Sequence, residues 1–402
     1  MKTNSVFDRL SKAMCCGCGV CAGICPTQAI TIRVTSEGIN YPVLDTTKCI
    51  FCGKCQQVCP GFGFDHKELN ISIFGQAPEN ALIGNFQAIY KGYSGNGDLR
   101  FSCSSGGLVT TMSIELLRNK VVDGVVVTRL KYGREVRAEA FIASTEEEIF
   151  NAKGSKYCPV SLDKAIIELK RNPRKVAVVC LPCHAIALRK AMSHDKVLKE
   201  SIVLILALFC NQAPSYRALS RYLKKHKVSA SQVTYFQWRG DGWPGKTKIK
   251  VDNQHEISEL STDAWATCFG SGYFTPLACY CCQDFFGDFS DISFGDAWLP
   301  EQKGDTIGTN VMIIRSDKGK QIVDGLVDAK KIHADNLRLQ AILNAFTINT
   351  RTKRICYPLH ANLIGNCPGV TGMSVLGAPS CKVVVKEFIR LVKLFVGVRL
   401  HA

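Results

Sequence analysis

Two stretches decide the N-terminal fold: CCGCGVCAGICP at residues 15–26 and CIFCGKCQQVCP at residues 49–60. Both read Cys-x2-Cys-x2-Cys-x3-Cys-Pro, which is the complete bacterial spacing for paired 4Fe–4S clusters. The short spacers let three thiolates of one run wrap one cube, and the bend after them sends the fourth thiolate to the other cube. We therefore expect two 4Fe–4S clusters within the first sixty residues.

The fourth cysteine of each run is thus expected to serve the cluster of the other run. The expected ligands are Cys15, Cys18, Cys21 and Cys59 for the first cluster, and Cys49, Cys52, Cys55 and Cys25 for the second. The alternative is a pair of zinc sites, but zinc proteins usually present their four ligands as two separated pairs. Cys16 is left over by this spacing and is expected to be a bystander.

The whole chain of 402 residues contains 21 cysteines, and nine of them lie between residues 15 and 59. The first residues, MKTNSVFDRLSKAMCC, lack the apolar core of a secretory signal. No apolar run approaches the roughly 20 residues of a membrane-spanning helix. We therefore expect a cytoplasmic protein, in which clustered cysteines indicate metal binding rather than disulfides.

The formal net charge is +16. A basic surface suits an acidic redox partner protein, an anionic substrate or a membrane surface. No groove-reading motif or pattern of stacking aromatic residues accompanies this charge, so a nucleic-acid partner is not expected.

The pattern along the chain predicts two kinds of architecture. The first 75 residues are expected to form a ferredoxin-like α+β module, in which residues 29–45 make a β-hairpin. Residues 65–86 indicate a linker. After it, β-branched runs alternate with amphipathic helices, which is typical of an α/β core with a mostly parallel sheet. Strands are expected at 121–130, 138–144, 175–182, 201–210 and 309–316, and helices at 161–172, 184–192, 215–226 and 316–329.

Seven further segments follow one another in a recognisable order. They are SCSSGGLVT (102–110), DGVVVTR (123–129), KGSKYCPV (153–160), CLPCHAIALRK (180–190), LFCNQAPS (208–215), ACYCCQDFFGDFSDISFGDAW (278–298) and GTNVMIIRSDKGK (308–320). Over roughly residues 86–370 the chain resembles the coenzyme F420 hydrogenase/dehydrogenase beta-subunit family. Members of this family are flavoproteins that pass electrons between iron–sulfur clusters and a deazaflavin or a related acceptor. A ferredoxin module in front of this region is common in the family.

The resemblance implies a division of the chain into four parts. Residues 1–75 are the 4Fe–4S ferredoxin domain, residues 76–172 and 173–350 are the N- and C-terminal parts of an α/β flavin-binding core, and residues 351–402 are a basic C-terminal segment.

The residues of SCSSGGLVT are by themselves suited to binding phosphate, because small residues lead directly into a helix. A helix N-terminus approached by glycines binds phosphate through free N–H groups and the helix dipole. The resemblance implies that this phosphate belongs to FAD, and that KGSKY is a second flavin-contacting segment. The alternatives are an ordinary capped helix and a solvated lysine loop. The candidate FAD-binding residues are Ser102, Ser104, Ser105, Gly106, Gly107, Lys153, Gly154, Ser155, Lys156 and Tyr157.

Four cysteines outside the first module are candidates for a third 4Fe–4S cluster. Cys183 and Cys210 each follow a buried strand, and Cys279 and Cys282 form a C-x2-C pair. Because the carboxyl ends of neighbouring parallel strands meet at one crevice, these thiols are expected to converge beside the flavin. The resemblance supports this ligand set, since these positions match recurrent cysteines of the family. The alternative is that Cys183 and Cys210 are small buried apolar residues.

The chain departs from the family pattern at three positions: Cys103 stands where serine is usual, His184 where glutamine is common, and Cys180 where a smaller residue is found. These differences concern the second substrate more than the flavin. A histidine with a near-neutral pKa can donate a proton during substrate reduction, which makes His184 a candidate catalytic residue. A polar group in the first turn of a helix is the interpretation that we favour.

The C-terminal segment is basic. Residues 351–354 (RTKR) are expected to be a solvated loop, and residues 383–400 are expected to form an amphipathic helix packed on the core. Peripheral contact of that helix with a membrane surface is the alternative that we do not favour.

Together these features predict an iron–sulfur flavoprotein oxidoreductase. It would exchange electrons with a redox partner protein or electron carrier, and pass them between 4Fe–4S clusters and FAD to a small organic substrate or a deazaflavin. The alternative is a non-catalytic electron-transfer subunit of a larger redox complex.

Overall fold

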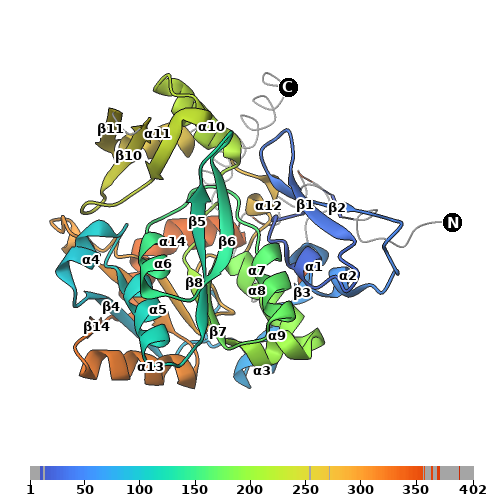
Figure 1. The fold of residues 1–402 in the computed structure, drawn as a ribbon. Helices are drawn as coiled ribbons and strands as arrows, with labels where there is room; N and C mark the ends of the chain where they lie inside the picture. Colours follow the sequence, from blue (N-terminus) through green and yellow to red (C-terminus); the bar gives the residue numbers. More distant parts are fainter. Residues whose placement is uncertain are drawn as a thin grey trace.

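The computed structural model describes residues 10–11, 14–252, 255–270, 272–355, 357, 364, 369–371 and 389. Its centre is an eight-stranded sheet with strand order β14-β4-β13-β12-β8-β7-β5-β6 (Figure 1). The four neighbours β12, β8, β7 and β5 run parallel, and the other neighbouring pairs run antiparallel. The strands are β4 (Ala88–Ser94), β5 (Gly124–Lys131), β6 (Arg137–Ala143), β7 (Val176–Cys180), β8 (Ile202–Leu208), β12 (Ile292–Asp296), β13 (Asn310–Ile314) and β14 (Ile332–Asn336). The predicted α/β core with its parallel strands is therefore confirmed.

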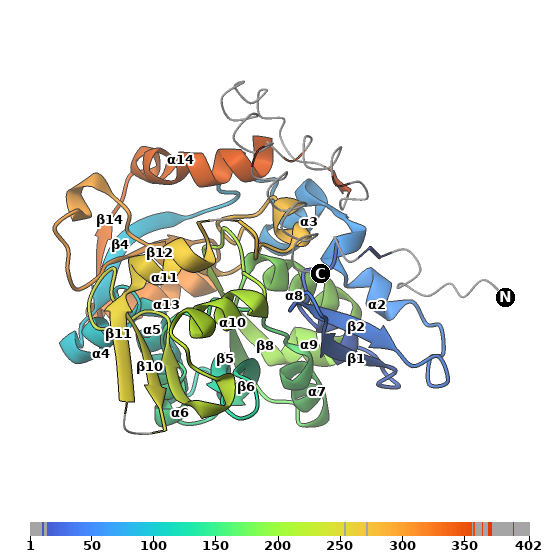
Figure 2. The ribbon, with the colours of Figure 1, turned by 90° about the horizontal axis from the view of Figure 1, so that it is seen from above.

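Helices cover both faces of this sheet, because alternate residues of each strand point to opposite sides. Val125 and Val127 pack under α5 (Leu108–Arg118) and α13 (Asp317–Asp328). Val126, between them, packs with α7 (Asp163–Arg171), α8 (Pro182–His194) and α9 (Lys196–Ser201). On that second face α14 (Leu339–Ile355) covers β4 and β13 (Figure 2).

A smaller antiparallel sheet, which the sequence did not lead us to expect, stands beside the main one (Figure 1). It packs against α10 and α11 around the buried side chains of Tyr222 and Trp238. Its parts are β9 (Val233–Gln237), β10 (Lys246–Val251), β11 (His255–Leu260), α10 (Tyr216–Lys225) and α11 (Ser261–Cys268). The remaining helices include α4 (Gly97–Ser102), α6 (Glu146–Asn151) and α12 (Leu277–Tyr280).

The N-terminal module contains the predicted hairpin, formed by β1 (Ile30–Val34) and β2 (Asn40–Leu44). Each cysteine run contains a short helix, α1 (Val20–Gly23) or α2 (Lys54–Gln57), before its fourth cysteine. The residue before each helix is a glycine in the left-handed region, with φ 74° at Gly19 and 73° at Gly53. This conformation suits glycine and lets the backbone fold around a cluster. The two cysteine runs are thus alike in structure as well as in sequence.

The expected linker 65–86 is wrong in its first part, because α3 (His66–Phe74) forms there. Asp65 caps this helix by accepting a hydrogen bond from the Glu68 N–H at 2.8 Å, and Asn70, within the helix, is buried. A cap and a buried polar side chain stabilise a helix whose sequence has weak helical periodicity.

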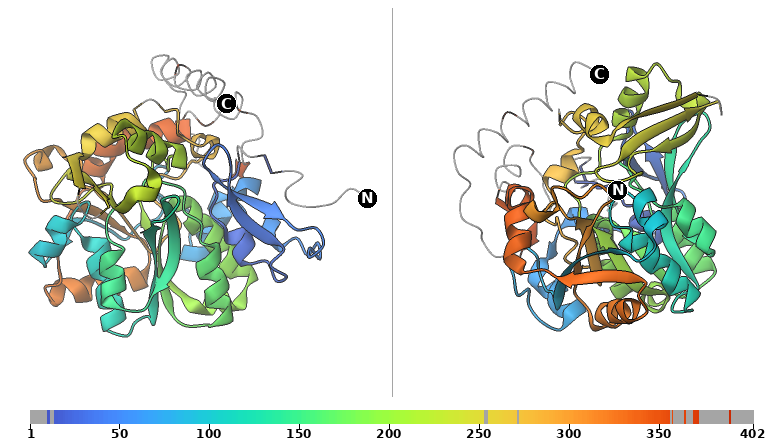
Figure 3. Two further views of the ribbon diagram at one scale, coloured as in Figure 1. Left: turned by 45° about the horizontal axis from the view of Figure 1, so that its top comes forward. Right: turned by 90° about the vertical axis from the view of Figure 1, so that its left-hand side faces the viewer.

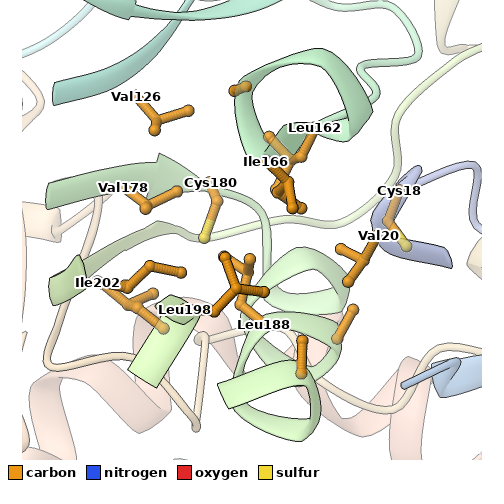
Figure 4. Close-up of a cluster of buried hydrophobic side chains, with 14 of the residues drawn as sticks. Cys18, Val20, Val126, Leu162, Ile166, Val178, Cys180, Leu188, Leu198 and Ile202 are labelled. Atoms are coloured by element: carbon orange, nitrogen blue, oxygen red, sulfur yellow. The ribbon is translucent and has the colours of Figure 1, made fainter. Parts of the chain in front are cut away.

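The module packs directly on α7 and α8 (Figure 1 and the left view of Figure 3). Val20 and Cys18 lie against Leu162 and Ile166 of the core, as Figure 4 shows. The Leu162 N–H also donates to the Cys18 carbonyl at 2.9 Å. At Gly19 a Cβ atom would lie 1.9 Å from the Ser161 hydroxyl oxygen, so the close approach requires glycine.

The expected solvated loop at 351–354 is also wrong, because these residues belong to the last turns of α14 and Lys353 is buried. The amphipathic helix expected at 383–400 lies outside the described residues. Among the helices that are described, none is long and apolar enough to cross a membrane.

Arg315 joins the main sheet to the segment before β4. Its guanidinium is fully buried, donates to the carbonyls of Asn85 (2.6 Å) and Phe286 (3.2 Å), and lies 3.8 Å from the Asp288 carboxylate. Arg315→Met removes one partner of a buried charge pair, so we expect it to lower the free energy of unfolding by about 3–5 kcal/mol. Anaerobic urea denaturation measures this loss.

The matched control is Arg134→Met, at an exposed position, where a change within about 0.5 kcal/mol is expected. A loss below about 1 kcal/mol for Arg315→Met would show that the surrounding carbonyls find other donors.

Candidate cofactor sites

The four thiols predicted to hold the first cluster come together in the structure. They line one small cavity together with a fifth thiol, that of Cys16. Its other walls are Leu10, Gly17, Gly19, Ile32, Pro42 and Val58. Burial and the nearby Cys16 thiolate raise the pKa of Cys59 to about 12. For Cys21, burial raises the pKa first, and the neighbouring thiolates of Cys59 and Cys15 add to it. Crowded, buried thiols of this kind become stable anions only when a metal replaces their protons.

The second predicted set lies at the surface of the module. Burial raises the pKa of Cys55 to about 11, and the thiolates of Cys25 and Cys52 act in the same direction. The Cys49 sulfur accepts the Phe51 N–H at 3.4 Å, in the manner of backbone donors around a cluster. Cys52 is exposed, and so are the two apolar side chains of this loop, Ile50 (63%) and Phe51 (52%).

These thiols do not form a centre for a single ion. Within the part of the chain that the structure describes, no three His, Cys, Asp or Glu side chains lie as close together as one metal ion requires. A 4Fe–4S cube places each thiolate on a different iron, so its ligands are spread around a larger object.

Cys16, which the sequence left as a bystander, lies between two predicted ligand sets. Its thiol hydrogen-bonds with the thiols of Cys18 and Cys183, and these bonds hold its pKa well below the usual range despite burial. Cys16 therefore connects the first cysteine run with the core of the protein. Sequence spacing gave no signal for this position, because Cys183 is distant in the chain.

The third predicted set also gathers in one place. Cys183 lies in the first turn of α8, Cys210 follows β8, and Cys279 and Cys282 lie in and just after α12. Burial raises the pKa of Cys210 to about 12, and the thiolates of Cys279 and Cys282 add to this shift. The thiolates of Cys282 and Cys210 are also among the groups that raise the pKa of Cys183. Cys281 is in a disulfide bond.

Lys353 is a neighbour of this set that the sequence analysis missed. Its ammonium reaches the carbonyl of Asp284 at 3.2 Å, and the Cys282 thiol donates to the same carbonyl at 3.4 Å. Burial would lower the lysine pKa, but the thiolates of Cys282, Cys210 and Cys279 outweigh it and raise the pKa above its ordinary value.

A cavity of about 880 Å³ opens at the carboxyl ends of the parallel strands β5, β7, β8 and β12. This is where open α/β sheets bind their ligands, and the volume is in the range of cofactor pockets. Both predicted flavin segments line it, through Ser104, Ser105, Gly107 and residues 153–157. Ser102 and Gly106 lie behind the wall: Ser102 ends α4, and a Cβ on Gly106 would meet the Asn310 nitrogen at 2.8 Å.

The start of α5 faces this cavity. Gly107 precedes the helix with φ 78° and offers no capping side chain, and the Leu108 N–H donates to the side-chain oxygen of Asn310 at 3.3 Å. The N-terminus of an eleven-residue helix beside a cavity is suited to a phosphate group. The fit supports the predicted phosphate-binding role of this segment.

Ser104 joins the two flavin segments to the opposite wall. Its hydroxyl oxygen accepts the Ser155 N–H at 2.8 Å, and the hydroxyl donates to the Arg239 carbonyl at 3.3 Å. Lys156 is held by hydrogen bonds within its own loop. Burial lowers its pKa to about 7, and its ammonium donates to the carbonyls of Ala152, Lys153 and Gly154, where it holds the loop in shape.

Two further residues of the cavity escaped the sequence analysis. Arg239 is 4% exposed, forms an ion pair with Asp296 at 2.7 Å, and donates to the Tyr157 hydroxyl at 3.4 Å. Asp296 ends β12, and its presence in the FGDAW segment was the one available signal. The pair fixes one wall of the cavity against the small sheet.

His184 is in the first turn of α8, as expected, and it also lines the cavity. Its Nδ1 is 3.5 Å from the Leu181 N–H, and burial lowers its pKa. The Cys16 thiolate acts against this effect of burial on the His184 pKa, so the two side chains are near each other. Cys210 of the third set lines the same cavity.

Three regions of the chain match known families. Residues 14–62 match the 4Fe-4S dicluster domain, residues 89–166 match the N-terminal region of the coenzyme F420 hydrogenase/dehydrogenase beta subunit, and residues 173–339 match its C-terminal region. The first match supports iron–sulfur binding by the two cysteine runs.

Two similar proteins illustrate the kinds of enzyme that the chain resembles. A coenzyme F420-dependent sulfite reductase of Methanocaldococcus jannaschii is 25% identical over 335 residues, which are 80% of this chain and 47% of the reductase. The chain thus spans about half the length of that relative. A coenzyme F420 hydrogenase subunit beta of Methanothermobacter thermautotrophicus is 24% identical over 258 residues, which are 62% of this chain and 84% of the subunit.

A solved structure shares the fold. A chain of the F420-reducing NiFe hydrogenase complex of Methanosarcina barkeri has a TM-score of 0.56 at 18% identity, and the match covers 73% of this chain and 98% of that one. Because two beta-subunit regions match in order behind a 4Fe–4S domain, the chain belongs to the coenzyme F420 hydrogenase/dehydrogenase beta-subunit family.

Proposed function

We propose that this protein is an iron–sulfur flavoprotein oxidoreductase that passes electrons between 4Fe–4S clusters and FAD, and between FAD and a deazaflavin or another small organic substrate. The observation that carries the proposal is the order of the sites. The second cysteine set, in which Cys52 is exposed and the others are half-buried, is followed by the first set. Cys16 and the third set come next, and the cavity that Cys210 lines comes last.

When bound, the clusters would supply one-electron carriers, and FAD would supply the link to two-electron chemistry. The protein's own residues hold and shield these groups. The proposed ligands are the eight cysteines of the two runs, followed by Cys183, Cys210, Cys279 and Cys282 for a third cluster. The apolar walls around the first set exclude water, and the start of α5 together with the loop 153–157 would hold the flavin.

The substrate is proposed from the relatives. Both relatives carry coenzyme F420 in their names, and this chain covers most of the hydrogenase subunit. The cavity differs from the family pattern at His184 and Cys103, which both line it. His184 remains a candidate proton donor because it lines this cavity, and a polar group in the first turn of α8 is the role that we favour.

An anaerobic preparation tests the proposal. We expect about twelve irons, about twelve sulfides and one FAD per chain, because three 4Fe–4S clusters are proposed. The purified protein alone is expected to oxidise reduced coenzyme F420 with a one-electron dye as acceptor. A colourless preparation would contradict the whole proposal.

The second candidate is a non-catalytic electron-transfer subunit, favoured by relatives that are named as subunits of larger enzymes. The exposed loop with Ile50 and Phe51 is then the proposed contact for a redox partner beside the second cluster. This function predicts full iron and flavin content without turnover of any small substrate by the isolated chain.

Flavin binding is expected to depend on Ser104. Ser104→Ala removes the acceptor of the Ser155 N–H and the donor to the Arg239 carbonyl, each worth about 0.5–1.5 kcal/mol. We therefore expect FAD to bind about tenfold more weakly, measured by titrating flavin-depleted protein with FAD and following its fluorescence.

The control is Ser102→Ala, whose hydroxyl donates to the Leu99 carbonyl at the end of α4, behind the cavity wall. The dissociation constant of FAD for Ser102→Ala should equal that for the unmodified protein. If both substitutions weakened FAD binding equally, the hydrogen bonds of Ser104 would have no specific role in holding the flavin.

A further inference from the structure

Lys353 is a buried cation in a place where no catalytic or binding role has been assigned. It lies on α14, and its side chain is only 6% exposed. Its ammonium and the Cys282 thiol meet at one oxygen atom, the carbonyl of Asp284, at 3.2 and 3.4 Å. Lys353 is therefore next to one of the four thiols of the third set.

Burying an ammonium group is costly unless negative charge lies close to it. The groups that act most strongly on Lys353 are the thiolates of Cys282, Cys210 and Cys279, followed by the carboxylate of Asp284. Three of these four are proposed cluster ligands. A cluster held by these cysteines would place its negative charge beside the buried Lys353 ammonium, which shares the Asp284 carbonyl with the Cys282 thiol.

We propose that Lys353 is the cation that offsets the negative charge of the third cluster and thereby raises its reduction potential. The inference rests on the proposed third cluster. A 4Fe–4S cluster with four thiolates carries about −2, and it gains one more negative charge when it accepts an electron from the donor. A fixed positive charge nearby stabilises the reduced form more than the oxidised form, most of all where water is excluded.

A purely structural role is the competing explanation. The Lys353 ammonium caps the Asp284 carbonyl, and α14 also packs on Phe285 and Phe286. If the role of Lys353 were purely structural, its replacement would change the stability of the fold but would not change the reduction potential of an assembled third cluster. Measuring that reduction potential therefore distinguishes the two explanations.

The test compares Lys353→Met, which removes the charge, with Lys353→Arg, which keeps it. Lys199→Met is the control, because Lys199 lies exposed on α9. Each full-length variant is purified anaerobically, its iron is counted, and its clusters are titrated with dithionite and followed by EPR. For Lys353→Met we expect one of three potentials to fall by at least the 59 mV that corresponds to a tenfold shift in a one-electron equilibrium. The reduction potentials of the other two clusters should not change in Lys353→Met, and none of the three should change in Lys199→Met.

The remaining outcomes are also decisive. If Lys353→Met loses about four irons while Lys353→Arg keeps them, the charge is needed to assemble the third cluster, and the inference stands. If all three potentials of Lys353→Met are unchanged, or if both Lys353 variants lose the cluster equally, the inference is overturned. If the unmodified protein holds only about eight irons and two reducible clusters, the proposed third cluster fails instead.

Discussion

Replacing Cys59 with serine is expected to remove the same cluster as replacing Cys15, although the two residues belong to different cysteine runs. Both thiols line one cavity, and the charge of Cys59 is one of those that raise the pKa of Cys15. Each variant should lose about four of the eight irons of the module and the same one of its two EPR signals. Iron analysis and EPR of the reduced proteins measure both effects.

The reciprocal pair completes this test. Cys25→Ser and Cys49→Ser should abolish the other EPR signal, because Cys25 lies near Cys55 rather than in the first cavity. Cys16→Ser is the matched control within the first run and should keep all the iron. If Cys59→Ser and Cys49→Ser removed the same signal, each run would bind its own cluster.

The largest effect in the core is expected for Cys210→Ser. This thiol belongs to the third set and also lines the large cavity, so its loss removes a proposed ligand at the point where the iron–sulfur chain meets the flavin site. We expect about four irons to be lost while the eight of the N-terminal module remain. Reduction of bound FAD through the module should then fail, as measured by stopped-flow absorbance with a reduced ferredoxin as donor.

Cys268→Ser is the control for this substitution. Cys268, at the end of α11, is also buried, but its thiol donates to the carbonyl of Ala218 in α10, away from the third set. Its iron content and flavin reduction should match those of the unmodified protein. Unchanged iron in Cys210→Ser would mean that this cysteine is an ordinary buried residue.

The sequence predicted most of what depends on short-range patterns. The hairpin at 29–45 and the helix that became α7 follow from local periodicity and turn residues, and the structure has both. The convergence of Cys183 with Cys210 was also predictable, because strand ends meet in a parallel sheet. The spacing of each cysteine run lies within a dozen residues, so it could be recognised from the sequence alone.

What the sequence did not predict depends on tertiary packing. RTKR at 351–354 has the composition of a solvated loop, and only the path of α14 across the sheet buries Lys353 beside cysteines some seventy residues or more away in the chain. The ion pair of Arg239 and Asp296 joins two sheets and leaves no local pattern. The Cys16 thiol lies beside Cys183 only because the module docks on α8.

Gly19 takes part in two features of the fold. Its left-handed turn bends the chain around the first group of thiols, and its missing side chain is also what lets the module settle against Ser161 and Leu162. One residue therefore serves both the bend of the cysteine run and the docking of the module. Any side chain at position 19 would disturb both at once, so this glycine links the local shape of the cysteine loop to the attachment of the whole module.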